Sequence, residues 1–361
     1  MTKRSFERVL PRADLGHLEG YHSAQVPCSV RLNTNESPFP PPLAWQEQLA
    51  DEVAAMDFNR YPDRQAGALR RAVGDFHRVE PENVFVANGS NEVLQTVCLA
   101  YGGTGRTALT FEPTYAMHAQ IARISGMAVI ETQRPNDFSL PHETVTEALR
   151  SSDADIVFVC SPNNPTGGLV DDDVLEATLD EAPGLVVVDE AYGQFAPRSA
   201  LRFVAEDRNL VVIRTFSKTW AMAGSRLGYC VGPTWLIDQL WDVVLPYHLD
   251  IVKQAAGRLA LRYEGEMRSR VEQLVAERNR LVVHLKSLPL AQVFESSANF
   301  VLFRVGPSAD AVWQELVNRG VLVRNCASWP GLSGCLRVTV GTSAENDFFV
   351  GALRDVLELS L

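Results

Sequence analysis

The chain has 361 residues, of which 46% are hydrophobic, and it carries a formal net charge of −11 with a pI near 5.2. This length suits a globular protein of about two domains, at roughly 150 residues per domain. The acidic balance argues against nucleic acid or an anionic membrane surface as the main partner, because both attract clustered cations.

The N-terminal residues have scattered charges and no apolar run of the kind a signal peptide needs, and the chain has no stretch of ~18 apolar residues. We therefore expect a cytoplasmic protein. The six cysteines form no CxxC pair and have no short spacing to histidine. We expect reduced thiols, no metal site and no disulfide framework.

The first structural signal is the Pro-rich segment 36–42 (ESPFPPP), which we expect to be an extended connector because proline fits neither helix interiors nor central strands. Apolar runs then predict strands at 84–87, 107–111, 128–132, 155–160, 185–190 and 210–216. Apolar spacings of three and four predict helices at 90–101, 115–126 and 171–182. This alternation predicts a mainly parallel sheet with helices on both faces.

The pattern changes after residue 233. A long charged helical stretch at about 250–287 precedes expected strands at 299–305, 321–325 and 335–341 and expected helices at 309–320 and 344–359. This order indicates a smaller α+β unit. We expect an N-terminal segment and connector (1–42) that packs with the small domain, a large domain (43–250) and a small C-terminal domain (251–361).

Lysine is scarce, and its placement singles out one residue. The four lysines are Lys3, Lys218, Lys253 and Lys286. Lys3 lies near the terminus, and the last two flank the charged helical stretch, where solvent exposure is the default. Lys218 instead follows an apolar strand at its carboxyl end, which is where open α/β sheets bind ligands. Any lysine-based chemistry therefore centres on Lys218.

The neighbours of Lys218 suit an anionic ligand. Thr215 and Ser217 supply hydroxyl groups and Arg226 supplies a cation, a combination that can hold a phosphate dianion beside the amine. Taken alone, the segment could equally be an ordinary loop with surface cations. The turn 88–92 (NGSNE) places Ser90 and Asn91 at a helix N-terminus, where free N–H groups favour phosphate, although such turns also serve for capping alone.

Two further strand ends carry polar groups. Asp189 ends the apolar strand of VVVDEAY and needs a cationic partner, such as a pyridinium nitrogen, to stay ionised. The same string also occurs in P-loop ATPases, but no lysine here follows a glycine as their phosphate-binding motif requires. The loop 161–167 (SPNNPTG) offers Asn163 and Asn164 as hydrogen-bonding groups, or is a plain turn. All these residues fall at one edge of the predicted sheet, so one cleft can use them.

An ordered set of motifs spans nearly the whole chain. It comprises NESP (35–38), RYPD (60–63), NGSNE, EPTY (112–115), SPNNPTG, DEAY (189–192), SKTWAMAGSRLG (217–228), SANF (297–300) and LRVTVGT (336–342). The set resembles the fold-type I aminotransferases that use pyridoxal 5′-phosphate, and among them the histidinol-phosphate aminotransferases. The resemblance implies an α/β fold with a large cofactor-binding domain, whose mainly parallel sheet lies between helices, and a smaller α+β domain.

The resemblance also implies roles for individual residues around the cofactor ring. Lys218 corresponds to the lysine that forms a Schiff base with the cofactor and then shuttles a proton, and Asp189 to the partner of the pyridine nitrogen. Asn164 and Tyr192 would contact the 3′-oxygen, Asn164 would also face the substrate, and Tyr115 would stack on the ring. A ring protonated through the aspartate acts as an electron sink, and the freed amine can move a proton.

The cofactor's phosphate group has its own implied set, which is Ser90, Asn91, Thr215, Ser217 and Arg226. Tyr61 would reach the phosphate of the neighbouring subunit's cofactor. The resemblance therefore implies a homodimer with its active sites at the subunit interface.

On the substrate side, Arg324 and Arg337 occupy positions that bind the anionic group of the substrate in the resembling family, with Tyr21 as a further candidate. Strand alternation allows another interpretation, because Arg337 lies on the face opposite Leu336 and Val338 and could be solvated. The segment 325–335 is longer and more aromatic than the family pattern, and His22 follows Tyr21 where a glycine-like turn is expected. We assign no role to His22.

The predicted reaction is amino-group transfer between histidinol phosphate and 2-oxoglutarate, giving imidazole-acetol phosphate and glutamate, as in histidine biosynthesis. An aromatic amino acid is the alternative donor, for which Trp220 and Trp329 leave room. A decarboxylase or oxidase could use the same cofactor and lysine. A cofactor-sensing regulator would need a DNA-binding appendage, and the N-terminal segment is too short and not basic enough for one.

Overall fold

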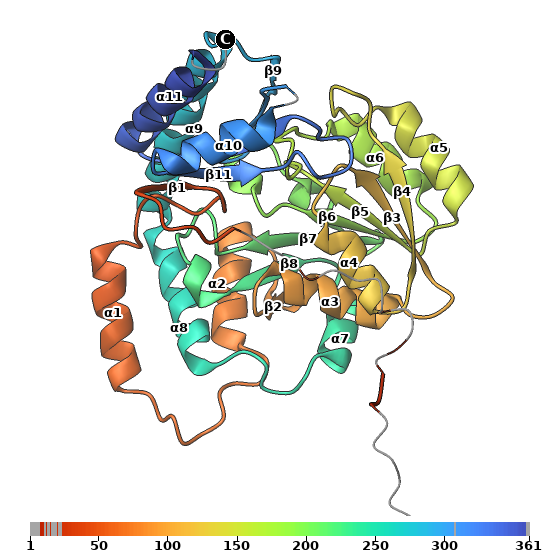
Figure 1. The fold of residues 1–361 in the computed structure, drawn as a ribbon. Coiled ribbons are helices and arrows are strands. Elements are labelled where there is room, and N and C mark those ends of the chain that lie inside the picture. Colours follow the sequence, from red (N-terminus) through yellow and green to blue (C-terminus); the bar gives the residue numbers. More distant parts are fainter. Residues whose placement is uncertain are drawn as a thin grey trace, which may run out of the picture.

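The computed structural model describes residues 8–10, 12, 15, 20, 24–306 and 308–358, and Figure 1 shows two sheets with their helices. The larger sheet has the strand order β2 (Val84–Ala87), β8 (Gly228–Val231), β7 (Leu210–Thr215), β6 (Leu185–Asp189), β5 (Ile156–Cys160), β3 (Thr107–Glu112) and β4 (Ala128–Gln133). Only β8 runs antiparallel to its neighbours in this sheet. The predicted mainly parallel sheet is confirmed, and β8 is the strand that the sequence did not predict.

The expected helices of the large sheet are present as α3 (Ser90–Tyr101), α4 (Met117–Ile124) and α6 (Asp172–Glu181). The sequence did not predict α1 (Leu43–Ala54), α2 (Gly67–His77), α5 (His142–Ser152) or α7 (Thr234–Val243). Each of these four starts without a side-chain hydrogen bond that caps it, as α3, α4 and α6 also do.

The centre of the large sheet is apolar on both faces. Every residue of β5, β6 and β7 is buried, and most are valine or isoleucine, whose branched side chains favour strands. Each fully buried side chain of this kind stabilises the fold by roughly 1.5–3 kcal/mol. This packing fixes the carboxyl ends of the three strands relative to one another, and those ends carry polar residues.

The smaller sheet has the order β1 (Val30–Leu32), β11 (Val321–Asn325), β12 (Cys335–Thr339), β10 (Phe300–Arg304) and β9 (Gln292–Val293), with α10 (Ala309–Asn318) and α11 (Ser343–Glu358) beside it. Its first strand comes from the N-terminal part of the chain and pairs in parallel with β11. The expected helical stretch at 250–287 is divided into α8 (Ile251–Ala260), a 3₁₀ turn (Leu261–Tyr263) and α9 (Glu264–Lys286). The domain boundaries near residues 42 and 250 stay a prediction.

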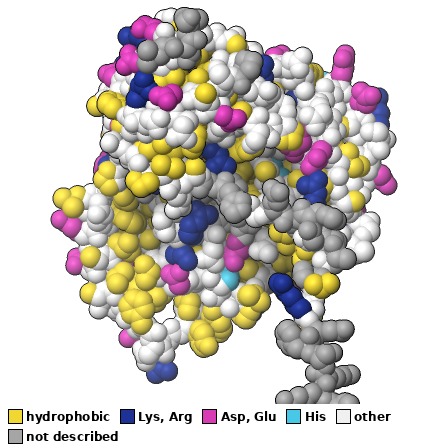
Figure 2. Space-filling view, viewed as in Figure 1, with side chains coloured by type: hydrophobic (Ala, Val, Ile, Leu, Met, Phe, Trp, Pro, Cys, Tyr) yellow, Lys and Arg dark blue, Asp and Glu magenta, His cyan; other side chains and the backbone are white. Residues whose placement is uncertain are grey.

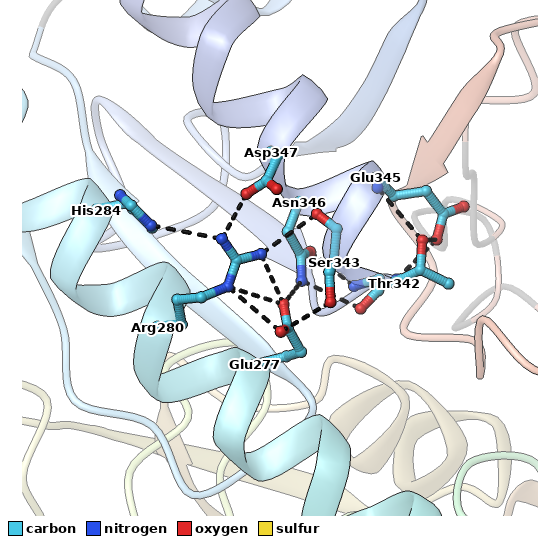
Figure 3. Close-up of polar contacts among 9 residues, drawn as sticks. Glu277, Arg280, His284, Thr342, Ser343, Glu345, Asn346 and Asp347 are labelled. Carbon is cyan, nitrogen blue, oxygen red and sulfur yellow. Dashed lines mark hydrogen bonds and ion pairs between the residues drawn. The ribbon is translucent and has the colours of Figure 1, made fainter.

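A polar cluster joins α9 to the start of α11, as Figure 3 shows. Glu277 accepts hydrogen bonds from Arg280 Nη2 at 2.8 Å, from Ser343 Oγ at 2.9 Å and from Asn346 Nδ2 at 3.0 Å. The hydrogen bonds from Arg280 are the largest cause of a lowered pKa of the Glu277 carboxyl group. Its carboxylate form, which accepts all three bonds, is thereby favoured, and it fixes α11 on the long helix.

Within the described residues, no helix is long and apolar enough to cross a membrane. The same part of the chain contains no cluster of His, Cys, Asp or Glu residues suited to a metal ion. All six cysteines are free thiols.

Candidate active site

A cavity of about 780 Å³ lies where the carboxyl ends of β5, β6 and β7 face β11 and β12 of the small sheet. The predicted site residues that line it are Ser90, Asn91, Tyr115, Asn164, Asp189, Tyr192, Thr215, Ser217, Lys218, Arg226, Arg324 and Arg337. Tyr61 does not line it and stacks instead on Tyr247 at the surface, with ring centroids 4.5 Å apart. Tyr21 lies outside the described residues.

Lys218 reaches this cavity from the loop that follows β7. Its Nζ donates a hydrogen bond to the Thr34 carbonyl at 2.9 Å. Burial, and then the positive charges of Arg337 and Arg226, lower the pKa of the Lys218 amine to about 7 against the opposing effect of Glu36. The neutral fraction of the amine near pH 7 is therefore much larger than that of an ordinary lysine. A neutral amine is the nucleophilic form that attacks a carbonyl group.

Asp189 ends β6 and is only 2% exposed. Its Oδ2 lies 3.0 Å from Nε2 of the fully buried His118, and its Oδ1 accepts a hydrogen bond from the Ala191 N–H at 3.0 Å. The His118 ring stacks on Phe158 with centroids 5.1 Å apart. The carboxylate is thus held in one orientation. Sequence analysis missed His118, although its place on α4 three residues after Tyr115 put it beside the predicted site.

A cradle of donors lies at the N-terminus of α3. Arg226 Nη1 donates to Ser217 Oγ at 3.2 Å, and Thr215 Oγ1 donates to the same oxygen at 3.0 Å. Gly89 has φ 85°, and a Cβ atom there would lie 2.9 Å from Arg226 Nη2. The glycine therefore keeps the guanidinium close to the first N–H groups of the helix. A helix N-terminus beside a cation suits a phosphate dianion.

The chain segment after β1 also enters the cavity, and sequence analysis assigned it no role. Asn35 Nδ2 donates to the hydroxyl of Tyr192 at 2.9 Å, and Thr339 Oγ1 donates to Asn35 Oδ1 at 3.1 Å. Burial raises the pKa of the Tyr192 hydroxyl to about 12, so the hydroxyl keeps its proton at neutral pH. The segment fixes that proton donor beside Lys218, whose Nζ lies 5.7 Å from the centroid of the Tyr192 ring.

Two arginines of the small sheet complete the cavity. Arg337 is only 5% exposed, and it donates to Asn164 Oδ1 through Nη1 and to the Asn33 carbonyl through Nη2 at 3.1 Å. The interpretation of Arg337 as a solvated residue is therefore wrong. Arg324 lies directly opposite Arg337 in the antiparallel pair of β11 and β12. The Arg324 guanidinium carbon lies 5.2 Å from the centroid of the Trp329 ring.

The fold and the cavity define a class of enzyme. The sequence profile of the aminotransferase class I and II family matches residues 29–353, and the chain belongs to this family. It is 44% identical to the histidinol-phosphate aminotransferase of Thermobifida fusca over 98% of this chain and 96% of that one. It is 40% identical to the enzyme of the same name from Corynebacterium glutamicum over the full length of both.

The solved structure of histidinol-phosphate aminotransferase from Sinorhizobium meliloti, in complex with pyridoxal 5′-phosphate, shares the fold. The TM-score is 0.85 at 23% identity, over 93% of this chain and 92% of that one. The predicted family, fold and enzyme class are confirmed. Pyridoxal 5′-phosphate is the cofactor of this family, and the residues present fit it. Lys218 has a lowered pKa, Asp189 is a buried carboxylate, and Gly89 leaves room for Arg226 beside the N-terminus of α3, where phosphate would bind.

Proposed function

We propose that this enzyme transfers an amino group between histidinol phosphate and 2-oxoglutarate, giving imidazole-acetol phosphate and glutamate, as a step of histidine biosynthesis in the cytoplasm. The observation that carries this proposal is the charge of the cavity. Beside Lys218 and Arg226, which serve the cofactor, Arg324 and Arg337 line the cavity, and Asp189 is the one carboxylate among its described lining residues. A doubly charged phosphate monoester suits such a cavity, and the names of the relatives agree with it.

Different residues around Lys218 would bind different parts of the cofactor. Ser90, Asn91, Thr215, Ser217 and Arg226 bind its phosphate at the N-terminus of α3. Asp189, oriented by His118, would pair with the pyridine nitrogen and keep a proton there. When bound, pyridoxal 5′-phosphate supplies an electron sink for the bonds at the reacting carbon of the substrate. Tyr192 and Asn164 would hydrogen-bond the 3′-oxygen, and Tyr115 would stack on the ring.

Lys218 then acts at its Nζ atom. This amine would hold the cofactor, and as a free amine it would accept a proton from the reacting carbon of the substrate and later release it. The low pKa of the Lys218 amine suits both steps, because a group that titrates near the working pH both accepts and releases a proton.

Arg324 and Arg337 bind the anionic end of the substrate. Because Arg337 is buried and already hydrogen-bonded to Asn164 and Asn33, its guanidinium is oriented before the substrate arrives. A guanidinium can bind phosphate through two parallel N–H donors, and a fixed one loses little side-chain entropy on binding. Asn164 connects the two sides of the site, since it contacts Arg337 and also lines the cavity with Lys218.

A panel of amino donors tests the proposed substrate. With 2-oxoglutarate as acceptor, we expect kcat/KM for histidinol phosphate to exceed that for phenylalanine or tyrosine by about 10³-fold or more, because a phosphate dianion can pair with both Arg324 and the buried Arg337, whereas an aromatic donor offers only a singly charged carboxylate. Glutamate formation is the measured product. An equal or higher kcat/KM for phenylalanine would replace the proposal with an aromatic aminotransferase. Carbon dioxide release without a need for the oxo acid would indicate a decarboxylase instead.

A homodimer is also part of this proposal, and one face of the molecule supports it. Large apolar side chains are exposed at Leu43, Phe58, Tyr61, Leu245 and Tyr247. Figure 2 shows hydrophobic side chains gathered over and between α1 and α8, next to the loop that carries Tyr61. Exposed apolar area of this kind marks an interaction surface. A second copy of the chain would cover it and bring Tyr61 to the partner's phosphate cradle.

We expect the purified enzyme to have about twice the mass of the 39.8 kDa chain in light scattering. Tyr61→Asp should dissociate the dimer, because it buries a carboxylate in an apolar interface without a partner. A wild-type protein that stays at the mass of one chain at micromolar concentration would contradict the dimer.

A further inference from the structure

The segment between β11 and β12 carries an indole ring that the proposed function does not use. Trp329 lines the cavity, and its ring lies under the Arg324 guanidinium at 5.2 Å. We propose that Trp329 is a specificity-determining residue, which positions Arg324 for the phosphate of the amino donor and thereby sets the preference for phosphorylated over unphosphorylated donors. This inference rests on the proposed function and names the residue that makes Arg324 selective for a phosphorylated donor.

The loop that carries Trp329 is built to hold the ring in place. The backbone N–H of Trp329 donates to the Cys326 carbonyl at 3.0 Å, and the backbone N–H of Leu332 donates to the Trp329 carbonyl at 3.0 Å. Leu332 is fully buried in an apolar cluster with Phe138, Phe294, Leu302, Cys326 and Cys335, against which Trp329 packs. These turns hold the backbone of the loop in place, and packing against the cluster restricts the orientation of the indole, as a positioning residue requires.

The loop also touches the cofactor side of the cavity. Gly331 has φ 75°, and a Cβ atom built on it would lie 3.8 Å from Pro113 Cδ. Pro113 belongs to the segment that carries Tyr115, which lines the same cavity. Trp329 therefore lies on a loop that leaves the small sheet and comes close to the segment with Pro113 and Tyr115. Both sides of the cavity thus limit where the loop can lie.

An aromatic partner has a specific advantage for Arg324. Arg324 and Arg337 lie opposite each other in register, where like charges repel. Each guanidinium lies over an aromatic ring, since the Arg337 carbon is 5.0 Å from the centroid of Phe300. An aromatic face attracts a cation through its quadrupole and leaves the net positive charge intact. Trp329 can thus help to orient Arg324 without neutralising its charge.

The test compares Trp329→Leu and Trp329→Phe with the wild-type holoenzyme. A cation–π contact of this kind corresponds to about three- to thirtyfold in binding. We expect Trp329→Leu to raise KM for histidinol phosphate by roughly tenfold with kcat nearly unchanged, and to leave KM for unphosphorylated histidinol unchanged. Trp329→Phe, which keeps an aromatic face, should lose about two- to threefold, and it decides the matter if the leucine variant does not fold.

Inorganic phosphate supplies a second readout that does not depend on the identity of the amino donor. In the holoenzyme the cofactor fills its own phosphate cradle, so added phosphate reports the substrate side. We expect its inhibition constant to rise in Trp329→Leu by the same factor as KM for histidinol phosphate. Trp235→Leu is the matched control, because Trp235 lies on α7 outside the residues that line the cavity. It should leave both constants unchanged.

Two results would overturn the inference. Equal losses for phosphorylated and unphosphorylated donors in Trp329→Leu would reduce Trp329 to a general structural role, and unchanged constants would remove it from the site. A wild-type enzyme that does not turn over histidinol phosphate would instead refute the proposed function, and the inhibition by phosphate, measured with whichever donor is active, would still test Trp329.

Discussion

Lys218→Ala should reduce kcat with any amino donor by at least about 10³-fold, because it removes both the covalent anchor and the proton-transfer group. The variant should still fold and bind the cofactor reversibly, since the phosphate cradle and Asp189 remain. Reduction with borohydride followed by peptide mass analysis gives a direct readout. The wild-type enzyme should carry the reduced cofactor on the peptide that contains Lys218, and the variant should carry none.

Lys286→Ala is the matched control for this variant. The Lys286 side chain is 52% exposed and pairs with Glu295 at the surface, so its removal should leave kcat within about twofold of the wild type. Retention of covalent cofactor in Lys218→Ala would show that another lysine is the anchor. The three remaining lysines would then be the candidates, and Lys253, which is partly buried and hydrogen-bonded to Asn88, would be examined first.

Arg337→Gln should lower kcat/KM for histidinol phosphate by roughly 10²–10³-fold, because a buried, preoriented cation that binds an anion contributes about 2–5 kcal/mol. Arg337→Lys should recover only part of this loss, since a lysine cannot form the two parallel bonds to an anion. Arg106→Gln is the control, because the Arg106 side chain is 58% exposed and pairs with Asp155 away from the cavity.

The same substitution should change the pH dependence of covalent attachment. The positive charge of Arg337 lowers the pKa of the Lys218 amine, so its removal should raise that pKa from about 7. The rate at which cofactor-free protein attaches the cofactor rises as the amine loses its proton, and the midpoint of this rise should move to higher pH in Arg337→Gln. An unchanged midpoint together with unchanged kcat/KM would contradict the role of Arg337.

Sequence patterns predicted the parts of this fold whose signals are local. The strand ends that carry Asp189 and Lys218 could be placed because apolar runs of five or six residues stop there and polar residues follow. The same reasoning failed for β8 (Gly228–Val231), a short strand that directly follows the Lys218 loop and pairs with β2, whose residues lie 141 (Ala87 to Gly228) to 147 (Val84 to Val231) positions earlier in the chain. All four residues of β8 are buried because the strand lies between β2 and β7, and so short a strand has no periodic pattern that would predict this.

The missed site residues share the same cause. Asn35 acts through Tyr192, which is 157 positions away, and His118 acts through Asp189, which is 71 positions away. A lone histidine on a helix gives no signal by itself, and Asn35, although it belongs to the NESP motif, acquires its role only where its segment meets Tyr192. Arg337 shows the converse, since alternation left its face undecided until the contacts with Asn164 and Asn33 placed it inside.

The central claim is that one cavity holds pyridoxal 5′-phosphate on Lys218 and accepts histidinol phosphate as amino donor. A single-turnover experiment tests it directly: the holoenzyme is mixed with one equivalent of histidinol phosphate and no oxo acid, and the visible absorbance of the bound cofactor is followed. The account predicts that this absorbance is lost, that imidazole-acetol phosphate forms in stoichiometric amount, and that 2-oxoglutarate restores the spectrum. A spectrum that histidinol phosphate leaves unchanged, in an enzyme that another amino donor bleaches, would contradict it.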